Sequence, residues 1–404
     1  MAKNFKISKL DWVLITSTVL LILFGLIAIY SSNYGGSGTG SSIFLKQLMW
    51  FVLGLFVMAV MIFIPSRAFF DFAYFIYALA LLMLVLVLFL GGGRGTEERW
   101  IRLFGFTIQP SEFAKIAVVI ALSRYLSLSK LGQNKVKDLI IAFILIAIPL
   151  YLVKEQPDLG TSLVFLVLLI PMLFWAGIQP FTLFVLISPF VSVISNIHFF
   201  FFFAWMLVMI GFLYFSKRPL LVIAGIFIIN IAAGISSQYI WDHLKPYQKS
   251  RLLILLDPQK DARGKGYQVL QSQNAIGSGG ISGKGFLKGT QTQLKFLPEQ
   301  STDFIFSVFG EEFGFIGIAL ALSFFFILLY RMINIAVNAR EKYEGLIVIG
   351  FVSIIVFHVF VNTGMTVGIM PVTGLPLPFL SYGGSFLLTC MIMIGISLNI
   401  AYKR

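Results

Sequence analysis

Two aspartates in the one long polar segment of this chain, residues 241–302, have the type and setting for proton transfer. Asp257 precedes Pro258, and Asp261 follows four residues later, just before a glycine-rich turn. Lysine and arginine at positions 260, 263 and 265 surround them, and nearby positive charge favours the ionised form of a carboxylate. An ionised carboxylate suits a general base better than a general acid. The alternative is a solvated loop held by salt bridges, and composition alone favours that alternative.

The same segment carries nine Lys or Arg against four Asp or Glu. Such an excess suits a phosphate-bearing partner, and the segment's many glycines allow the backbone to approach a ligand closely. We expect Lys265, Lys284 and Glu299, together with Asp303 just beyond the segment, to contact that partner. The three histidines are scattered and make no metal-ligand pattern. The sequence therefore leaves a metal unassigned, with a divalent cation such as Mg²⁺ or Mn²⁺ as an open alternative.

Glu112 and Lys115 are charges inside an otherwise apolar run. They are three residues apart, on one helical face, and Pro110 and Ser111 make a good helix start before them. An ion pair neutralised within a helix bundle is one interpretation. Because ionisable residues inside a membrane are costly and usually functional, we favour the other, a polar wall for a charged head group.

Three further residues lie at boundaries between apolar runs. Asp158 precedes a helix, and it is equally consistent with a helix cap and with a functional acid. Trp100 has the character of an interfacial aromatic anchor. Ser381 lies in MPVTGLPLPFLSYGGS, residues 370–385, where three prolines and three glycines exclude a single lipid-facing helix. Irregular backbone at that depth must be buried in protein or line a cavity, so we expect a re-entrant segment facing the long polar one.

The elements that must position these residues are membrane-spanning helices. Of the 404 residues, 58% are hydrophobic and 12% are charged, and the mean hydropathy is +0.94. No soluble domain has that balance, and apolar runs of about 20 residues can cross a bilayer. The sequence predicts an all-α polytopic membrane protein. The twelve expected spans are Trp12–Tyr30, Met49–Ile64, Phe69–Leu90, Ser111–Leu128, Leu139–Val153, Thr161–Trp175, Phe181–Ile194, Phe199–Phe215, Leu220–Ile235, Phe304–Met332, Leu346–Phe360 and Ser385–Ala401.

Basic residues of the short loops set the expected orientation, since cytoplasmic loops are enriched in Lys and Arg. The residues that place one side in the cytoplasm are Lys3, Lys6, Lys9, Arg67, Arg124, Lys130, Lys135, Lys137, Lys217, Arg218, Arg331, Arg340, Lys342, Lys403 and Arg404. Both termini are then cytoplasmic, and one large loop, 236–303, lies outside. The net charge of +13 fits these loops. No basic helix or aromatic RNA-binding strand accompanies it, so we expect no nucleic-acid partner.

Five stretches carry a resemblance to a known family. They are RWIRLFGFTIQPSEFAK at 99–115, QPDLGTSLVF at 156–165, LDPQKDARGKGYQVLQSQNAIGSGGISGKG at 256–285, FLPEQSTDFIFSVFGEEFG at 296–314 and GLPLPFLSYGGS at 374–385. Together, in this order, they resemble the SEDS family of cell-wall proteins (shape, elongation, division and sporulation). The stretch GKGFLKGTQTQLKFLPE is more similar to the elongation branch of the family, RodA, than to the division branch, FtsW.

The resemblance implies a peptidoglycan glycosyltransferase of the bacterial cytoplasmic membrane. Such an enzyme polymerises lipid II on the outer face, releases undecaprenyl pyrophosphate and works with a class B penicillin-binding protein that crosslinks the strands. The family's essential aspartate falls on Asp261, although Ala262 stands where the family usually has proline, so Asp257 is kept as runner-up. The family's tryptophan falls on Trp100, and its buried charges fall on Glu112 and Lys115.

Two questions stay open at this stage. The family typically has ten spans, so we interpret the chain as a single membrane domain, 1–404, with an inserted pair of spans at 180–216. A lipid II flippase is the competing function, because charges among spans and an unwound outer segment also suit a transporter. The clustering of the unusual residues on the outer side favours surface chemistry.

Overall fold

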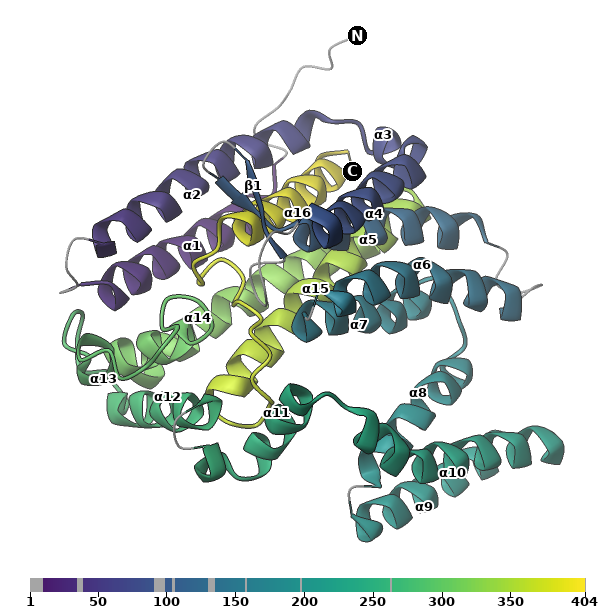
Figure 1. Cartoon of the computed structure of the whole chain (residues 1–404). Helices are drawn as coiled ribbons and strands as arrows, with labels where there is room; N and C mark the ends of the chain where they lie inside the picture. Colours follow the sequence, from purple (N-terminus) through teal and green to yellow (C-terminus); the bar gives the residue numbers. More distant parts are fainter. Residues whose placement is uncertain are drawn as a thin grey trace. The chain divides into compact units, whose positions relative to one another are not determined.

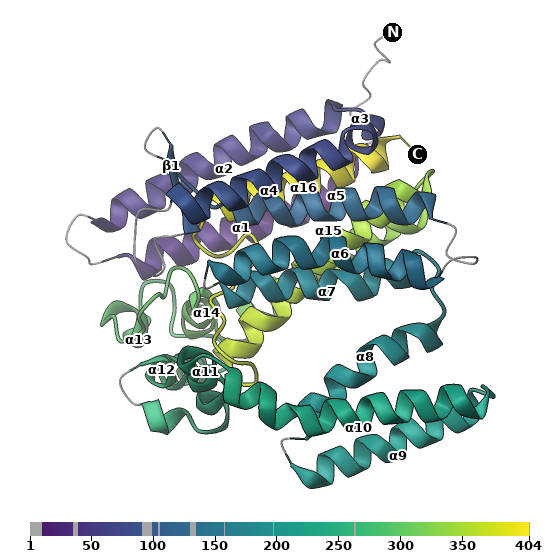
Figure 2. The same cartoon turned by 45° about the vertical axis from the view of Figure 1, so that its right-hand side comes forward.

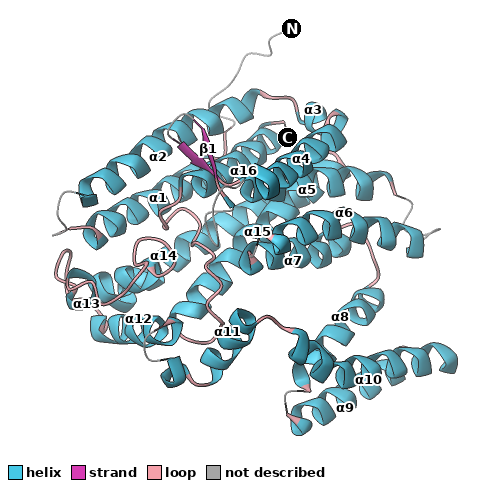
Figure 3. Cartoon of the chain, in the orientation of Figure 1, coloured by secondary structure: helices cyan, strands magenta, loops and turns pink. Residues whose placement is uncertain are grey.

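The computed structural model describes residues 10–34, 39–90, 99–103, 106–129, 135–156, 158–196, 198–261 and 264–403, and most of them are helical (Figures 1 and 3). The elements are α1 Trp12–Ser32, α2 Thr39–Phe63, α3 Ser66–Asp71, α4 Ala73–Leu90, β1 Ile101–Leu103, β2 Phe106–Ile108, α5 Pro110–Leu128, α6 Lys135–Glu155, α7 Leu159–Trp175, α8 Pro180–Ser195, α9 Phe199–Phe215, α10 Leu220–His243, α11 Pro246–Leu256, η3 Pro258–Asp261, α12 Lys265–Gly279, α13 Thr290–Gln293, α14 Ile305–Val337, α15 Lys342–Thr366 and α16 Gly384–Tyr402. The two short strands form an antiparallel hairpin with Ile101 opposite Ile108.

Each of the twelve expected apolar segments is mainly helical, although two of them contain a break. Among the residues that the structure describes, seven helical stretches are long and apolar enough to cross a membrane, and four more apolar helices are shorter. This confirms the all-α polytopic class. Lys3, Lys6, Lys9, Lys130 and Arg404, which entered the orientation argument, lie outside the described residues.

The first compact unit comprises Met1–Met172 and Ile254–Arg404. Within it α16 packs along α2, α1 along α14 and α4 along α5, while α15 contacts both α5 and α14 (Figures 1 and 2). Close approach of α16 to α2 depends on Gly395, because a Cβ there would lie 2.8 Å from the carbonyl oxygen of Met58. Small residues at helix interfaces are the usual means of tight packing in membranes.

The second unit, Leu173–Leu253, holds α8, α9 and α10. Its helices are joined by buried side-chain hydrogen bonds. The Asn230 amide donates to Ser188 Oγ at 3.0 Å and accepts from Ser192 Oγ at 2.7 Å, and Trp205 Nε1 donates to Ser192 Oγ at 2.9 Å. The expected pair of inserted spans, 180–216, falls in this unit together with α10, and its origin as an insertion stays a prediction.

Two spans expected to be continuous are broken. The span Phe69–Leu90 was wrong as one helix, because α3 ends at Asp71 before α4 begins. An Arg124 guanidinium nitrogen donates to the carbonyl oxygens of Phe70 and Asp71, each at 2.8 Å, and so replaces the helical bonds lost there. The second break, at Gly314 of α14, belongs to the candidate site.

The first residues of the predicted loop, 236–303, are helical, and the bounds of the loop stay a prediction. Helix α10 continues to His243, because no proline interrupts it before Pro246, and a residue preceding proline is disfavoured in a helix. Beyond it, the segment folds into α11, η3, α12 and α13.

Candidate active site

The carboxylate of Asp261 lies against the first turn of α12. The Gly266 N–H donates to Asp261 Oδ2 at 3.4 Å. A Cβ on Gly264 would lie 2.5 Å from both carboxylate oxygens, and one on Gly266 would lie 2.2 Å from the carbonyl oxygen of Pro258. Only glycine at these two positions therefore lets the helix begin this close to the acid. The N-terminus of a helix carries partial positive charge, which favours a carboxylate there.

Asp257, the runner-up acid, begins the same turn. Its Oδ1 accepts a hydrogen bond from the Gln259 N–H at 3.2 Å. This is the local bond by which aspartate commonly shapes a turn. Both acids are half-buried, but the start of α12 is built around Asp261.

A small apolar core packs around α12 and the segments next to the turn that carries Asp257 and Asp261. Its members come from α11, α12, the segment before α14, and the end of α15 with the segment that follows. They are Ile254, Val269, Leu297, Phe304, Met365 and Val372, each at most 5% exposed. The core fixes α12, and with it Asp261, on helices that the sequence places far away.

Helix α14 is broken at Gly314, whose φ and ψ are 64° and −162°. Residues 280–285 pass through the break. The carbonyl oxygens of Glu311 and Glu312 accept from the N–H groups of Lys284 at 3.0 Å and Gly285 at 2.9 Å. On the other side of the break, the N–H groups of Phe315 and Ile316 donate to the carbonyl oxygens of residues 280 and 281. The backbone groups that the break frees are thus paired with protein, as an apolar environment requires.

The Glu311 side chain ties the polar segment to this break. It is fully buried, and its Oε1 accepts from Lys284 Nζ at 2.8 Å and from the Gln291 N–H at 2.9 Å. Its Oε2 accepts from the Thr292 N–H at 3.0 Å and hydroxyl at 2.8 Å. One carboxylate therefore orders residues 284–292.

The neighbouring Glu312 faces α1. It accepts a hydrogen bond from the Ser31 hydroxyl, and Gln293 Nε2 donates to the carbonyl oxygen of Ser31 at 3.3 Å. The end of α1 is in this way bonded both to α14 and to the polar segment.

Residues 367–383, between α15 and α16, contain no helix or strand, and most of residues 371–381 are buried. Side chains of α15 form hydrogen bonds with backbone carbonyl groups of residues 367–383. Asn362 Nδ2 donates to the carbonyl oxygen of Leu375 at 2.8 Å, and His358 Nδ1 lies 3.0 Å from that of Pro376. Irregular backbone surrounded by protein is the arrangement expected for a re-entrant segment.

Ser381 joins that segment to the polar one. Its hydroxyl donates to the carbonyl oxygen of Thr302 at 2.6 Å and accepts from the Leu377 N–H at 2.8 Å. The expected substrate-binding residue thus has two backbone partners in the protein, and its contact with a substrate stays a prediction.

Glu112 and Lys115 form a buried ion pair of 2.8 Å. The Lys115 side chain is fully buried, and its Nζ also lies 3.2 Å from His358 Nε2. Because His358 Nδ1 is used toward the Pro376 carbonyl, Nε2 is the nitrogen that accepts from the ammonium group. The chain Glu112–Lys115–His358 therefore connects α5 through α15 to the re-entrant segment.

Asp158 caps α7 and also pairs with the hairpin side of the site. Its Oδ1 accepts from the Thr161 N–H at 3.1 Å, and its Oδ2 lies 3.7 Å from an Arg99 guanidinium nitrogen. Asp158 is therefore a helix cap that also makes an ion pair, and its role as a functional acid stays a prediction. The neighbouring Trp100 is 39% exposed, as an anchor at a membrane surface would be.

The remaining predicted residues occupy different settings. Lys265 is the first residue of α12 and is half-buried. Lys284 forms the ion pair with Glu311 described above. Glu299 is exposed and accepts from the Thr302 hydroxyl at 3.1 Å. The backbone carbonyl of Asp303 accepts from Asn362 Nδ2 at 2.9 Å.

These bonds bring several helix ends together at one end of the first unit. The re-entrant segment, the polar segment and the starts of α5, α7 and α16 meet there. Sequence reasoning missed the structural roles of Glu311, His358 and Asn362. Glu311 and its neighbour did carry a signal, since paired acids beside an apolar run are rare. Among the described residues, no group of three or more His, Cys, Asp or Glu side chains is placed to hold a metal ion.

The fold and the site together define a class of protein. It is a polytopic helical membrane protein with a polar site at one end, where a broken helix, a re-entrant segment and an acid at a helix start meet. The family model for cell-cycle proteins of the FtsW, RodA and SpoVE type matches residues 11–206 and 201–404. The chain belongs to this family, the SEDS family.

Similar proteins cover nearly the whole chain. Peptidoglycan glycosyltransferase MrdB of Escherichia coli K12 is 36% identical over 397 residues, which are 98% of this chain and 95% of that protein. Peptidoglycan glycosyltransferase RodA of Treponema pallidum is 33% identical over 98% of this chain and 99% of its own. Among solved structures, a chain from a study of how a peptidoglycan synthase complex coordinates polymerization and crosslinking is similar with a TM-score of 0.73. Its sequence is 28% identical, and the match covers 98% of both chains.

Proposed function

We propose that this protein is a peptidoglycan glycosyltransferase that polymerises lipid II on the outer face of the cytoplasmic membrane during cell elongation, with Asp261 as general base. The observation that carries the proposal is the Asp261 carboxylate held at the start of α12 by Gly264 and Gly266. The relatives named peptidoglycan glycosyltransferase support the reaction class.

The reaction joins two lipid-linked saccharides. A hydroxyl oxygen of the acceptor sugar attacks the anomeric carbon of the donor, and its proton passes to Asp261. A new C–O bond forms as the donor's bond to pyrophosphate breaks, and the electron pair leaves with undecaprenyl pyrophosphate. Held in a fixed orientation by their lipid tails in the membrane, the two reactants react as if at high effective concentration.

The leaving group needs its growing negative charge neutralised. Lys284 is less suited to this task than the sequence suggested, because Glu311 already offsets its charge at 2.8 Å. Lys265 belongs to the same helix start as Asp261 and is a second candidate for this task. A divalent cation would supply the same neutralisation.

The test is polymerisation of purified lipid II by the purified full-length chain. Asp261→Asn keeps the size of the side chain and one acceptor oxygen but removes the basic carboxylate, so we expect normal folding and a loss of about 100-fold or more in rate. Asp257→Asn is the matched control and should retain activity. Full activity of Asp261→Asn would refute the assignment of the base.

Two further conditions of the same assay test for a metal cofactor and for a protein partner. Adding a chelator, then restoring Mg²⁺ or Mn²⁺, tests whether a cation shares the neutralisation. Adding a class B penicillin-binding protein tests the proposed crosslinking partner, which the similarity to a chain of a peptidoglycan synthase complex supports. Lipid II transfer across vesicles without polymerisation in any arm would favour the flippase instead, for which the buried Glu112–Lys115 pair would be the polar element.

A further inference from the structure

A cavity of about 410 Å³ lies at the opposite end of the first unit from the re-entrant segment. It is formed by α3, the last residues of α5 and the first residues of α15. The nine lining residues are Ser66, Arg67, Phe70, Ser127, Leu128, Glu341, Lys342, Tyr343 and Glu344. Its volume is in the range of small-ligand pockets, and the proposed polymerisation does not use it.

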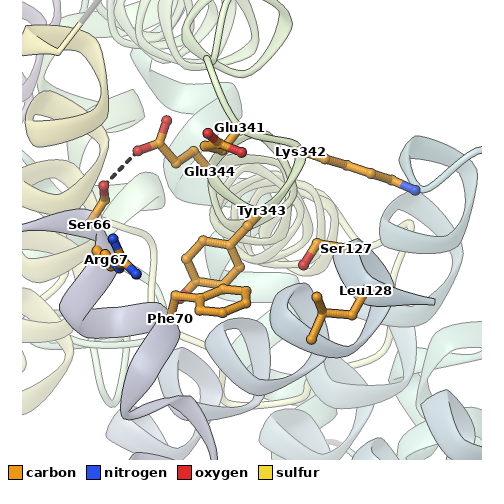
Figure 4. A pocket seen from close by; sticks show the side chains of 9 residues that line it. All are labelled: Ser66, Arg67, Phe70, Ser127, Leu128, Glu341, Lys342, Tyr343 and Glu344. Atoms are coloured by element: carbon orange, nitrogen blue, oxygen red, sulfur yellow. Dashed lines mark hydrogen bonds between the residues drawn. The ribbon is translucent and has the colours of Figure 1, made fainter.

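Aromatic rings occupy the middle of the lining. Phe70 and Tyr343 pack edge to face with centroids 5.0 Å apart, and Figure 4 shows Ser66 and Arg67 to one side of them and Ser127 and Leu128 to the other. The Tyr343 residue is only 5% exposed, yet its hydroxyl has no hydrogen-bond partner in the part of the chain that the structure describes. A buried hydroxyl without a partner costs free energy, so an acceptor brought within its reach would contribute to binding.

The charged groups of the lining balance. Arg67 and Lys342 are exposed, and the Arg67 guanidinium lies 3.9 Å from the Asp71 carboxylate. Of the two acids, Glu341 is exposed, whereas buried Glu344 accepts from Ser66 Oγ at 2.6 Å. The lining thus presents two cations and two carboxylates and has no net charge.

Two cations outside the lining add to these charges. The Arg124 guanidinium lies 4.8 Å from the centroid of the Phe70 ring. Lys403 Nζ donates to Ser66 Oγ at 2.8 Å. Burial lowers the pKa of this ammonium group, while Glu344 opposes that shift. Because the Lys403–Ser66–Glu344 chain already pairs Glu344, exposed Glu341 is the acid available to a ligand.

The cavity lies where apolar helices end. Leu128, the last residue of α5, is 63% exposed, and the apolar part of α15 begins at Leu346, just after the lining residues. Basic and aromatic residues at helix ends mark the membrane–water boundary, here on the side that the sequence predicts to be cytoplasmic. A ligand at this depth has one end in water and one in hydrocarbon.

We propose that this cavity binds the head group of phosphatidylethanolamine from the membrane. Its phosphate is the acceptor for the Tyr343 hydroxyl and the partner of Arg67 and Lys342. Its primary ammonium group pairs with Glu341, and its acyl chains leave over Leu128. A zwitterionic head group matches a lining of no net charge, whereas a purely anionic one would leave Glu341 facing negative charge.

The test is titration of the purified, delipidated full-length protein with single lipids, followed by native mass spectrometry. The probes are dioleoyl phosphatidylethanolamine, phosphatidylcholine and phosphatidylglycerol, with inorganic phosphate as competitor. The double variant Tyr343→Phe, Arg67→Gln removes the phenol hydroxyl and the guanidinium charge, and it should cost about tenfold or more in affinity for phosphatidylethanolamine. Tyr330→Phe makes the same chemical change at a 57% exposed tyrosine of α14 and is expected to leave binding unchanged.

Glu341→Gln separates head groups. It is expected to reduce the preference for phosphatidylethanolamine over phosphatidylcholine, whose quaternary ammonium offers no N–H. Equal binding of all three lipids, or binding unchanged by the double variant, would overturn the site. Displacement of the lipid by millimolar phosphate, or a preference for phosphatidylglycerol, would overturn the assignment of the ligand. The readout does not depend on glycan polymerisation, so failure here leaves the proposed function untouched.

Discussion

Replacing Glu311 by glutamine is expected to release the polar segment without unfolding the bundle. The glutamine retains one acceptor oxygen, but its amide nitrogen must face either the Lys284 and Gln291 donors or the Thr292 donors. Either orientation leaves at least one buried N–H without an acceptor and removes the charge that pairs with Lys284. A hydrogen bond to a charged group contributes about 1.5–3 kcal/mol, and an unpaired buried donor costs a similar amount, so we expect a loss of about 3 kcal/mol.

This loss falls on residues 284–292, because the other ties of α14 are unchanged. Local opening free energies are read by amide hydrogen exchange, and about 3 kcal/mol corresponds to exchange on the order of 100-fold faster. Hydrogen-exchange mass spectrometry of the purified protein should show this acceleration in peptides covering 284–292, with α16 peptides unchanged.

The matched control is Glu299→Gln, which removes the same charge from an exposed glutamate of the same segment. It should leave exchange unaltered. If Glu311→Gln exchanged like the wild type, the carboxylate would not be what orders this segment. If α16 accelerated equally, the effect would be global unfolding, and the reasoning would also fail.

Three further substitutions test other parts of the site. Gly264→Ala would push a Cβ to 2.5 Å from the Asp261 carboxylate; we expect a fold stable to heating but polymerisation about 100-fold slower, and a normal rate would argue against Asp261 as base. Gly314→Ala places a side chain at a φ of 64° against the backbone that passes through the break; a loss of about 3 kcal/mol should lower the melting temperature in detergent, and an unchanged melting temperature would contradict the described break. Lys115→Met leaves Glu112 as an uncompensated buried charge, which costs about 3–5 kcal/mol; adding Glu112→Gln should recover part of the loss, and no recovery would mean that the two residues do not act as a pair.

Local sequence patterns predicted the helical class well because the bilayer imposes a local requirement. A run of apolar residues long enough to cross the membrane must pair its backbone groups within itself, and that requirement is met by a helix whatever its neighbours are. The prolines and glycines of residues 370–385 indicated irregular backbone for the same local reason. The glycines after Asp261 indicated a turn at the acid, but the helix start that follows the turn was seen only in the structure.

Continuity of helices was not readable in the same way. No residue near Phe72 in sequence indicates the break between α3 and α4. The donor that replaces the lost helical N–H groups is Arg124, which lies 52 residues later in the chain. A glycine in an apolar run, such as Gly314, has no local signature that separates a tolerated helical residue from a break.

What the sequence by itself determined is therefore the set of helices, the polar segment between them and the acid at its turn. Only the tertiary structure decided which polar groups meet. It paired Lys115 with His358, and it set the Glu311 carboxylate among donors 19 or more residues away. Ser381 was joined to a carbonyl group of the polar segment. The physical reason is that buried polar groups need partners but not neighbours in sequence, so the choice among possible partners is made when the helices pack.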